Sequence, residues 1–253
     1  MSSIANRAVL AAVMAGAVSA SPAFAYVTIY TDASAWQAAV TGVTFEESFD
    51  DAALECGLSV MSDVGVINSG RFNDRVTRSG GESTTFHWNL PVDAIGGIWD
   101  LSPGGPGQGL ALTAEVHSGG TVSLYEIPNT TQGGFVGFVS DMPIDDLVIR
   151  AGTQSGVAET YNLDGLRWAE AAKTVSVGDC DTGIENRMSG SCSLNEVINT
   201  ASLGCEYSVS NHGDYVSCIA NATKALMSAA SITGAEKGRI TSCAARSDTG
   251  KPD

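Results

Sequence analysis

The stretch from residue 26 to about residue 171 alternates apolar and polar side chains in short runs. Residues 85–90 read Thr-Phe-His-Trp-Asn-Leu, and residues 110–117 read Leu-Ala-Leu-Thr-Ala-Glu-Val-His. A strand turns every second side chain to the same side, so each run has one apolar face and one polar face. Glycine-rich turn signals separate the runs. The pattern predicts a mainly β fold, a jelly-roll-like antiparallel β-sandwich.

The chain changes character after residue 172. Ser193-x-x-Glu196 and Thr233-x-x-Glu236 match the capping box that begins many helices, and apolar residues between them recur at helical spacing. We expect three helices, over 194–203, 213–229 and 234–246. Three helices of this length build only a small core, so we expect disulfides to reinforce the module.

The first 25 residues have the pattern of a cleavable signal peptide. Arg7 gives a positive start, residues 8–18 are apolar, and Ala23-Phe24-Ala25 matches a cleavage site. We therefore expect a secreted protein, either extracellular or periplasmic. The expected segments are a signal peptide (1–25), a β-sandwich domain (26–171), a linker (172–179) and a cysteine-rich helical module (180–253).

All six cysteines follow the expected cleavage site, at Cys56, Cys180, Cys192, Cys205, Cys218 and Cys243. An even number of cysteines in an exported chain indicates disulfides. No C-x-x-C motif is present, which argues against a zinc ribbon or a thioredoxin-like redox site. Since only Cys56 lies in the first region, full pairing requires it to reach the tail or to link two molecules. The spacing does not choose among the pairings.

The formal net charge of −15 limits the partners of this chain. Phosphate backbones and anionic membrane surfaces repel an acidic protein, so we expect no nucleic-acid partner. No segment after the signal peptide reaches the roughly 18 apolar residues that span a bilayer, so we expect no membrane insertion after cleavage. An acidic surface can attract cations such as calcium.

Four segments of the first region carry a family resemblance. They are Phe45…Phe49-Asp50-Asp51, Gly96-Gly97-Ile98-Trp99-Asp100-Leu101, Gly134-Phe135-Val136-Gly137-Phe138-Val139-Ser140-Asp141 and Tyr161-x-Leu163-Asp164-Gly165-Leu166. Over residues 27–169 the chain resembles a β-sandwich domain of bacterial exported proteins, often ones with an exosortase-type (PEP-CTERM) sorting tail. The chain has no Pro-Glu-Pro motif, terminal apolar helix or terminal arginine cluster, so we expect no anchoring by that route.

The tail shows a second resemblance. With Cys180-Asp181-Thr182-Gly183 and Lys237-Gly238-x-Ile240-x-Ser242-Cys243, it is similar to a small helical module appended to bacterial secreted proteins. Together the two resemblances imply a bacterial exported protein, and they assign no activity to it.

Glu47 is a charged residue that the strand pattern places on an apolar face. In a strand over residues 43–49, Glu47 shares its face with Phe45 and Phe49. A carboxylate that points at a core must be paired or bound to a metal. The alternative is that Glu47 lies at the end of the strand and is solvated.

The expected last strand of the sandwich contains Asp164. The alternation of its apolar residues changes at Gly165, which predicts a bulge that re-aims Asp164. In sandwich domains of the carbohydrate-binding type, calcium often joins the first and last strands. We therefore expect a structural Ca²⁺ ion, held by backbone carbonyls and by carboxylates drawn from Glu47, Asp50, Asp51 and Asp164.

Aromatic side chains are the second class of candidate ligand-binding residues. A sugar-stacking platform could be formed by Trp88, Trp99, Tyr125 and Trp168. Each of them shares a face with other apolar residues, so packing in the core is the alternative.

No local catalytic signature is present. The sequence has no H-E-x-x-H and no G-x-S-x-G motif, and the glycines of residues 104–109 lack the G-K-[ST] ending of a phosphate loop. His87 and His117 fall on the polar faces of their strands, where we expect them to be solvated. Adjacent carboxylates such as Asp145 and Asp146 are abundant, and glycosidases need two carboxylates across a cleft.

The sequence thus favours a secreted, non-catalytic binding or structural protein. Its expected partner is a polysaccharide or an extracellular or surface protein. The alternative is a secreted hydrolase that acts on carbohydrate through paired carboxylates.

Overall fold

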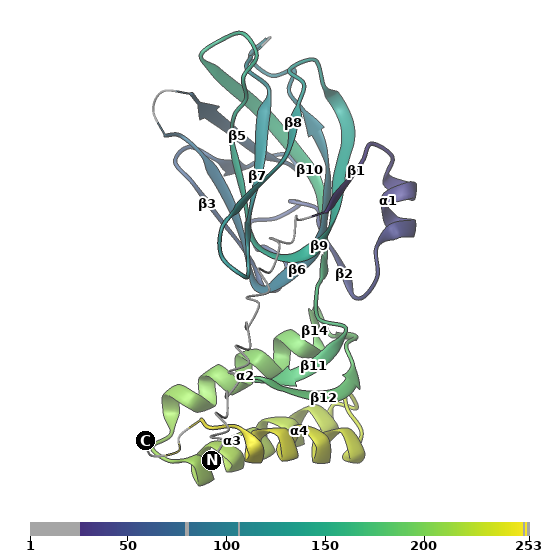
Figure 1. Ribbon diagram of the computed structural model, residues 1–253, viewed down its shortest axis with the longest axis vertical. Coiled ribbons are helices and arrows are strands. Elements are labelled where there is room, and N and C mark those ends of the chain that lie inside the picture. The colour runs from purple at the N-terminus through teal and green to yellow at the C-terminus, as the bar shows by residue number, and fades with distance from the viewer. Residues whose placement is uncertain (1–25, 79–80, 106, 250, 252–253) are drawn as a thin grey trace, which may run out of the picture.

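Ten antiparallel strands form the upper body of the protein (Figure 1). The computed structural model describes residues 26–78, 81–105, 107–249 and 251, so the expected signal peptide at residues 1–25 lies outside the described residues. The strands are β1 (Val27–Tyr30), β2 (Thr44–Glu47), β3 (Leu58–Ser62), β4 (Val66–Ile67), β5 (Phe72–Thr77), β6 (Thr84–Asp100), β7 (Leu110–Val116), β8 (Thr121–Ile127), β9 (Gln132–Ala151) and β10 (Ala158–Glu170).

The long strands β6 and β9 take part in both layers of a sandwich. The first part of β6 pairs with β3 and with the end of β9, where Thr84 lies opposite Ile149. The last part of β6 pairs with β10 and with the start of β9, where Ile98 lies opposite both Asp164 and Phe135. The first layer has the order β3-β6-β9-β7-β8. The second has the order β4-β5-β10-β6-β9-β1, and β2 pairs with the last part of β10. The predicted antiparallel, jelly-roll-like sandwich is confirmed.

Alternate side chains of the two layers meet in one apolar core. Leu110, Leu112 and Ala114 of β7 are buried, as their alternation predicts, and Phe86 of β6 lies in the same cluster. Burial of a large apolar side chain contributes about 1.5–3 kcal/mol, so this core is the main source of stability in the upper body.

Helix α1 (Ala33–Ala39) covers the outer face of the second layer. Its N-cap is Asp32, whose side chain accepts a hydrogen bond from the Ala35 N–H group at 2.8 Å. Trp36 is fully buried and donates from Nε1 to the Phe138 carbonyl at 3.2 Å. A Cβ atom at Gly137 would lie 2.8 Å from the Trp36 ring, so glycine leaves room for the indole.

The lower body combines short strands with three helices (Figure 1). Its elements are β11 (Thr174–Val177), β12 (Cys180–Glu185), β13 (Met188–Ser189), β14 (Cys192–Ser193), α2 (Leu194–Ser208), α3 (His212–Ser228) and α4 (Gly234–Arg246). The three predicted helices are confirmed, with α2 extending five residues beyond its predicted end at 203.

Two details of the lower body correct the sequence analysis. Residues 172–179, expected to be a linker, include strand β11, which pairs with β12 and buries Val175 and Val177 in the lower core. The capping box at Thr233 is complete. At Ser193 the hydroxyl caps α2 as expected, but the Glu196 carboxylate accepts from Asn89 of the upper body instead.

Three disulfides join all six cysteines, as the even count predicts. They are Cys56–Cys192, Cys180–Cys243 and Cys205–Cys218. The first one connects the two bodies, because Cys56 precedes β3 and Cys192 begins β14. Cys56 therefore reaches the tail within one molecule.

Two buried or half-buried hydrogen bonds and one exposed ion pair reinforce this junction. The Asn89 Nδ2 group donates to Glu196 Oε1 at 3.0 Å, and Asn186 Nδ2 donates to Glu170 Oε2 at 2.7 Å. Lys173 donates from Nζ to Asp93 Oδ2 at 2.6 Å. The junction thus combines one covalent bond with hydrogen bonds that need both bodies in place.

We expect the Cys56→Ala/Cys192→Ala pair of substitutions to destabilise the protein more than Cys205→Ala/Cys218→Ala. The first bond joins residues 136 apart and the second joins residues 13 apart. In the chain-entropy description, a loop of ~100 residues corresponds to about 4.7 kcal/mol and a loop of ~15 residues to about 3 kcal/mol. Urea unfolding of both oxidised variants measures the difference. A larger loss of stability in the Cys205→Ala/Cys218→Ala variant would show that loop-closure entropy does not determine how much each disulfide stabilises the protein.

A second prediction concerns the pH dependence of the junction. Burial raises the pKa of Glu170, since this effect outweighs the hydrogen bonds from Ser193 and Asn186. A raised folded-state pKa gives stability that is present below the unfolded pKa and is lost as pH rises through the folded pKa. Glu170→Gln keeps an acceptor for Asn186 and cannot ionise. We expect its urea midpoint to exceed that of wild type at neutral pH and to match it below about pH 4. A lower midpoint for the variant at neutral pH would contradict this account.

Candidate functional site

The outward side chains of β10 form a polar row on the outer face of the second layer. Tyr161 and Leu163 point into the core, whereas Thr160, Asn162 and Asp164 lie on the opposite, partly exposed side of the strand. This follows from the period of two along a strand. The row therefore places hydroxyl, carboxamide and carboxylate groups on one face.

The bulge predicted at Gly165 is confirmed. The pairing of β10 with β6 shifts register between Asp164 and Arg167, and Gly165 has a φ of 54°. A non-glycine residue rarely adopts this left-handed conformation, so glycine suits the bulge. The extra residue returns Arg167 to the outer face, where it extends the polar row.

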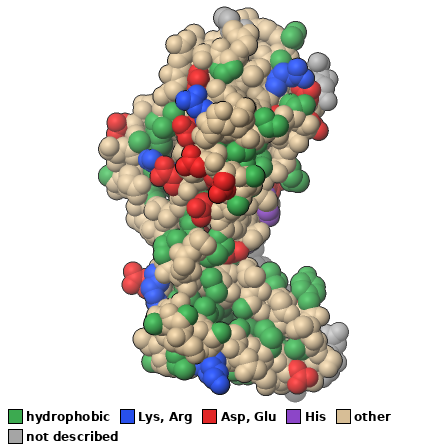
Figure 2. Space-filling model, turned by 180° about the vertical axis from the view of Figure 1, so that it is seen from behind, with side chains coloured by type: hydrophobic (Ala, Val, Ile, Leu, Met, Phe, Trp, Pro, Cys, Tyr) green, Lys and Arg blue, Asp and Glu red, His purple; other side chains and the backbone are tan. Residues whose placement is uncertain are grey.

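A small cleft of about 50 Å³ lies on this outer face. We call it the sheet-face cleft, and it is lined by Arg71, Ile98, Asp100, Gly133, Asn162 and Asp164. Strand register brings its walls together, because Asn162 lies opposite Asp100 and Asp164 lies opposite Ile98. Figure 2 shows acidic side chains gathered with a few basic ones over the middle of the upper body, on the face that it presents.

The charges of the sheet-face cleft are partly balanced within it. The Nε atom of Arg71 lies 3.9 Å from Asp164 Oδ2. A hydrogen bond from Ser102 is the main cause that lowers the pKa of Asp100. Ile98 is 39% exposed and supplies an apolar patch among these polar groups. The cleft therefore offers an ionised carboxylate, a carboxamide and a guanidinium around an aliphatic side chain.

Two further cavities continue this face toward helix α1. Their volumes are about 450 Å³ and 370 Å³, and Arg167 and Gln37 line both. Arg167 donates from Nη2 to Glu46 Oε1 at 2.9 Å. A Cβ atom at Gly165 would lie 3.3 Å from the same Glu46 oxygen, so the Glu46 carboxylate lies over the bulge beside Asp164. Polar side chains thus extend from the cleft to the helix.

Two of the carboxylates expected to bind calcium, Glu47 and Asp164, occupy the neighbouring strands β2 and β10. β2 pairs with β10, and Glu47 lies opposite Leu166. Glu47 is 4% exposed, which confirms that it points inward. Its two oxygens accept the backbone N–H groups of Phe49 at 2.6 Å and Glu55 at 2.8 Å. These bonds anchor the turn that follows β2.

The remaining three carboxylates each lie near a different group. Asp51 accepts from the Ala53 N–H group at 2.8 Å, Asp164 faces Arg71, and a Cβ atom at Gly70 would lie 3.3 Å from Asp50 Oδ1. Within the part of the chain that the structure describes, no group of three His, Cys, Asp or Glu side chains is placed to hold a metal. Calcium at Glu47 stays a prediction, and the ion would compete there with two backbone hydrogen bonds.

The tryptophans expected as a stacking platform lie in the core, which corrects that assignment. Trp88, Trp99 and Trp168 are at most 3% exposed. Trp168 stacks on Phe45 with ring centroids 5.4 Å apart, and Trp99 packs near Tyr161. Their rings have no free face for a sugar in this structure. Tyr125 of β8 is half-buried and packs against the edge of the same core.

Two histidine–aspartate pairs lie on the first layer, and sequence reasoning missed them. His87 Nδ1 lies 2.7 Å from Asp146 Oδ1, and His117 Nδ1 lies 2.9 Å from Asp145 Oδ1. His87 and Asp146 are cross-strand neighbours in β6 and β9, which the alternation alone could not reveal. Both imidazoles are substantially exposed, and neither lines the cavities described above.

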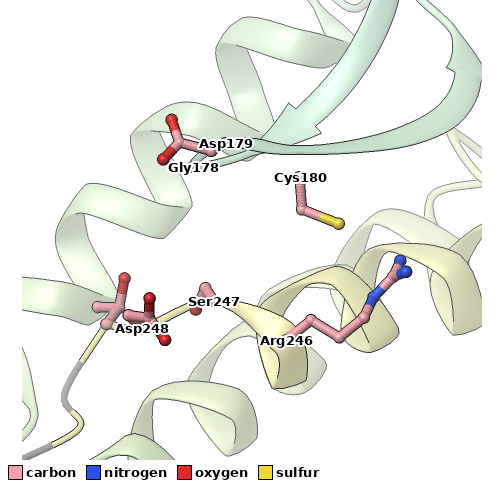
Figure 3. Close-up of a pocket in the computed structure, with 7 residues that line it drawn as sticks. Gly178, Asp179, Cys180, Arg246, Ser247 and Asp248 are labelled. Atoms are coloured by element: carbon pink, nitrogen blue, oxygen red, sulfur yellow. The ribbon is translucent and has the colours of Figure 1, made fainter. Parts of the chain in front are cut away.

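The largest of the described cavities, of about 500 Å³, lies in the lower body between the β11–β12 turn and the end of α4. Figure 3 shows Asp179 and Cys180 on one side of this space and Ser247 and Asp248 on the other. Two of its charged groups have partners: Asp248 accepts from Lys251 at 2.8 Å, and Arg246 donates to Cys243 Sγ at 3.4 Å. Asp179, the third charged residue of the lining, is exposed to solvent.

Comparisons with known proteins give structural neighbours alone. No known family matches the sequence, and no curated protein matches it. A family 29 carbohydrate-binding module complexed with mannohexaose aligns with a TM-score of 0.39 and 10% identity, over 51% of this chain and 92% of that one. A family 32 module from a glycoside hydrolase of Clostridium perfringens aligns with a TM-score of 0.34 and 8% identity, over 47% and 100%. The sandwich assignment rests on the strand pairing described above.

None of the helices in the described residues is both long and apolar enough to cross a membrane.

We expect Glu47→Ala to destabilise the protein by about 3 kcal/mol, because it leaves two buried backbone N–H groups without their acceptor. Thermal unfolding in calcium and in EDTA measures the effect. The same loss in both buffers would assign Glu47 to the anchoring of the turn after β2. A loss seen in calcium alone would instead support the metal site.

Proposed function

We propose that the protein binds a carbohydrate chain outside the cell, without catalysis, through the sheet-face cleft. The observation that carries this proposal is the convergence of Arg71, Asp100, Asn162 and Asp164 around the exposed Ile98. Sugars present closely spaced hydroxyl groups together with apolar C–H faces. Carboxylate, carboxamide and guanidinium groups pair with hydroxyls in a directional way, and an aliphatic side chain packs against the C–H face.

The electrostatics of the cleft favour binding over hydrolysis. A glycosidase needs one carboxylic acid whose raised pKa keeps it protonated, together with a second carboxylate across the cleft. Asp100 has a lowered pKa, so it is ionised at neutral pH and cannot donate that proton. Asp164 lies 3.9 Å from the Arg71 guanidinium, so the two carboxylates of the cleft are not placed alone across an open space.

Location outside the cell is part of the same proposal. Three disulfides account for every cysteine, and such bonds persist in oxidising compartments. The pattern of residues 1–25 supports export, and the sequence resemblance to exported bacterial β-sandwich domains agrees with it.

The test is retention of the purified, oxidised protein in native gels that contain single soluble polysaccharides, with calcium and then with EDTA. We expect retention by at least one glycan. We expect Asn162→Ala and Asp164→Asn to weaken it about tenfold, because one lost hydrogen bond is worth roughly 1.4 kcal/mol. Glu115→Ala, an exposed carboxylate of β7, is the matched control and should bind like wild type.

Three results would overturn the proposal. Retention by no glycan in either buffer would remove carbohydrate as the ligand. Unchanged retention of both cleft variants would move the site elsewhere on the protein. Release of new reducing ends from a retained glycan would show hydrolysis and reinstate the catalytic alternative.

A further inference from the structure

A second pocket lies at one end of the sandwich, between the β6–β7 and β9–β10 connections. Its volume is about 280 Å³. We call it the glycine-lined pocket, and its walls are Pro103, Gly104, Gly105, Gly107, Gly156, Val157, Ala158, Glu159 and Thr160. Most of this wall is backbone, and Glu159 is its only ionisable side chain.

Glu159 is buried and only half satisfied. It is 1% exposed, and its Oε2 atom accepts the Gly109 N–H group at 2.6 Å. Its Oε1 atom is buried and has no hydrogen-bond partner among the described residues. Glu159 forms no ion pair with any described Lys, Arg or His side chain. Burial accordingly raises the pKa of Glu159, since backbone hydrogen bonding, chiefly from Gly109, does not offset the lost hydration.

A second unsatisfied oxygen belongs to Gln108, which follows the pocket residue Gly107 in the β6–β7 connection and does not itself line the pocket. Gln108 is fully buried, and its Nε2 group donates to the Gly156 carbonyl at 2.7 Å. Its Oε1 atom, like that of Glu159, has no partner among the described residues. Both orphan atoms are acceptors, and buried acceptors without a donor or a positive charge are costly. A cation or a proton would relieve this cost, whereas an anion would increase it.

The backbone is shaped to approach the carboxylate closely. A Cβ atom at Gly107 would lie 2.5 Å from Glu159 Oε2 and 2.6 Å from Oε1, so any larger residue at this position would displace the Glu159 carboxylate. Glycines at 104 and 105 adopt φ angles of 84° and 83°, which other residues rarely accept. The sequence thus keeps side chains away from the oxygen atoms of Glu159.

We propose that the glycine-lined pocket is a cation-binding site, in which Glu159 supplies the charged protein oxygen ligand. The ligand is a positively charged group that takes oxygen lone pairs, either a metal ion such as calcium or an ammonium group. The 280 Å³ of the pocket leaves room for water molecules to complete the coordination of a metal ion. This site is separate from the sheet-face cleft, and from the calcium site expected at Glu47.

The experiment is calorimetric titration of the purified, oxidised and chelator-treated protein. The titrants are calcium chloride, magnesium chloride and methylammonium chloride, and choline chloride at matched ionic strength controls for screening. We expect saturable binding of one cation per chain, and a rise in Tm of about 3 °C at saturation. Metal and ammonium titrants distinguish the two sources of positive charge.

Variants locate the site. Glu159→Gln keeps the shape and removes the charge, so we expect at least tenfold weaker binding and a Tm in chelator at or above that of wild type. Glu115→Gln removes one exposed negative charge from β7 and should bind like wild type. If Glu159→Gln fails to fold, Gln108→Met tests the same site, because it removes the hydrogen bond that holds the Gly156 carbonyl in the pocket wall, and it should also weaken binding.

The proposal is overturned if wild type binds none of the three cations, because protonation of Glu159 would then be sufficient. It is also overturned if binding survives unchanged in both Glu159→Gln and Gln108→Met. Neither outcome bears on glycan retention, which depends on the other site.

Discussion

The pairing of β6 with β9 is the constraint on which the rest of the upper body depends. It runs from Thr84 opposite Ile149 in the first layer to Trp99 opposite Gly134 in the second. Because both strands continue from one layer into the other, a shift in their register would displace both layers together. Strands β3, β10, β7 and β1 each pair with β6 or β9, and β8 is attached through β7. The sheet-face cleft inherits its geometry from it, since β10 is aligned by β6.

Buried carboxylates in this protein are neutralised in different ways. Glu47 accepts two backbone N–H groups, and Asp74 accepts from the hydroxyls of Ser62 and Thr84. Glu170 is bonded to Asn186 across the junction. The carboxylate in the glycine-lined pocket has a single backbone donor and an unsatisfied second oxygen. This contrast within one molecule makes an external positive charge a natural partner for that pocket.

Local chemistry was predictable from the sequence, and long-range placement was not. Alternation predicted the strands, the capping motifs predicted the helices, and the change of parity at Gly165 predicted the bulge. The same alternation places Glu159 on the face of Tyr161, so its burial could have been inferred as it was for Glu47. Arg71 and Asp100 join the cleft only through strand register, which no local pattern encodes. Residues 172–179 were expected to be a linker because the sequence around Gly178 has no local sign of a strand. The strand β11 in this segment is recognisable only from its pairing with β12.

The Cys56–Cys192 bond also has a topological consequence. It closes a covalent ring that contains β3 through β13, and with them every strand of the sandwich except β1 and β2. A protease that cuts a loop inside this ring opens the polypeptide without releasing a fragment, because the pieces remain joined through sulfur. In an environment rich in secreted proteases, a nicked molecule could keep its strands paired and its surface sites assembled. The disulfide therefore protects the integrity of the protein after cleavage as well as during folding.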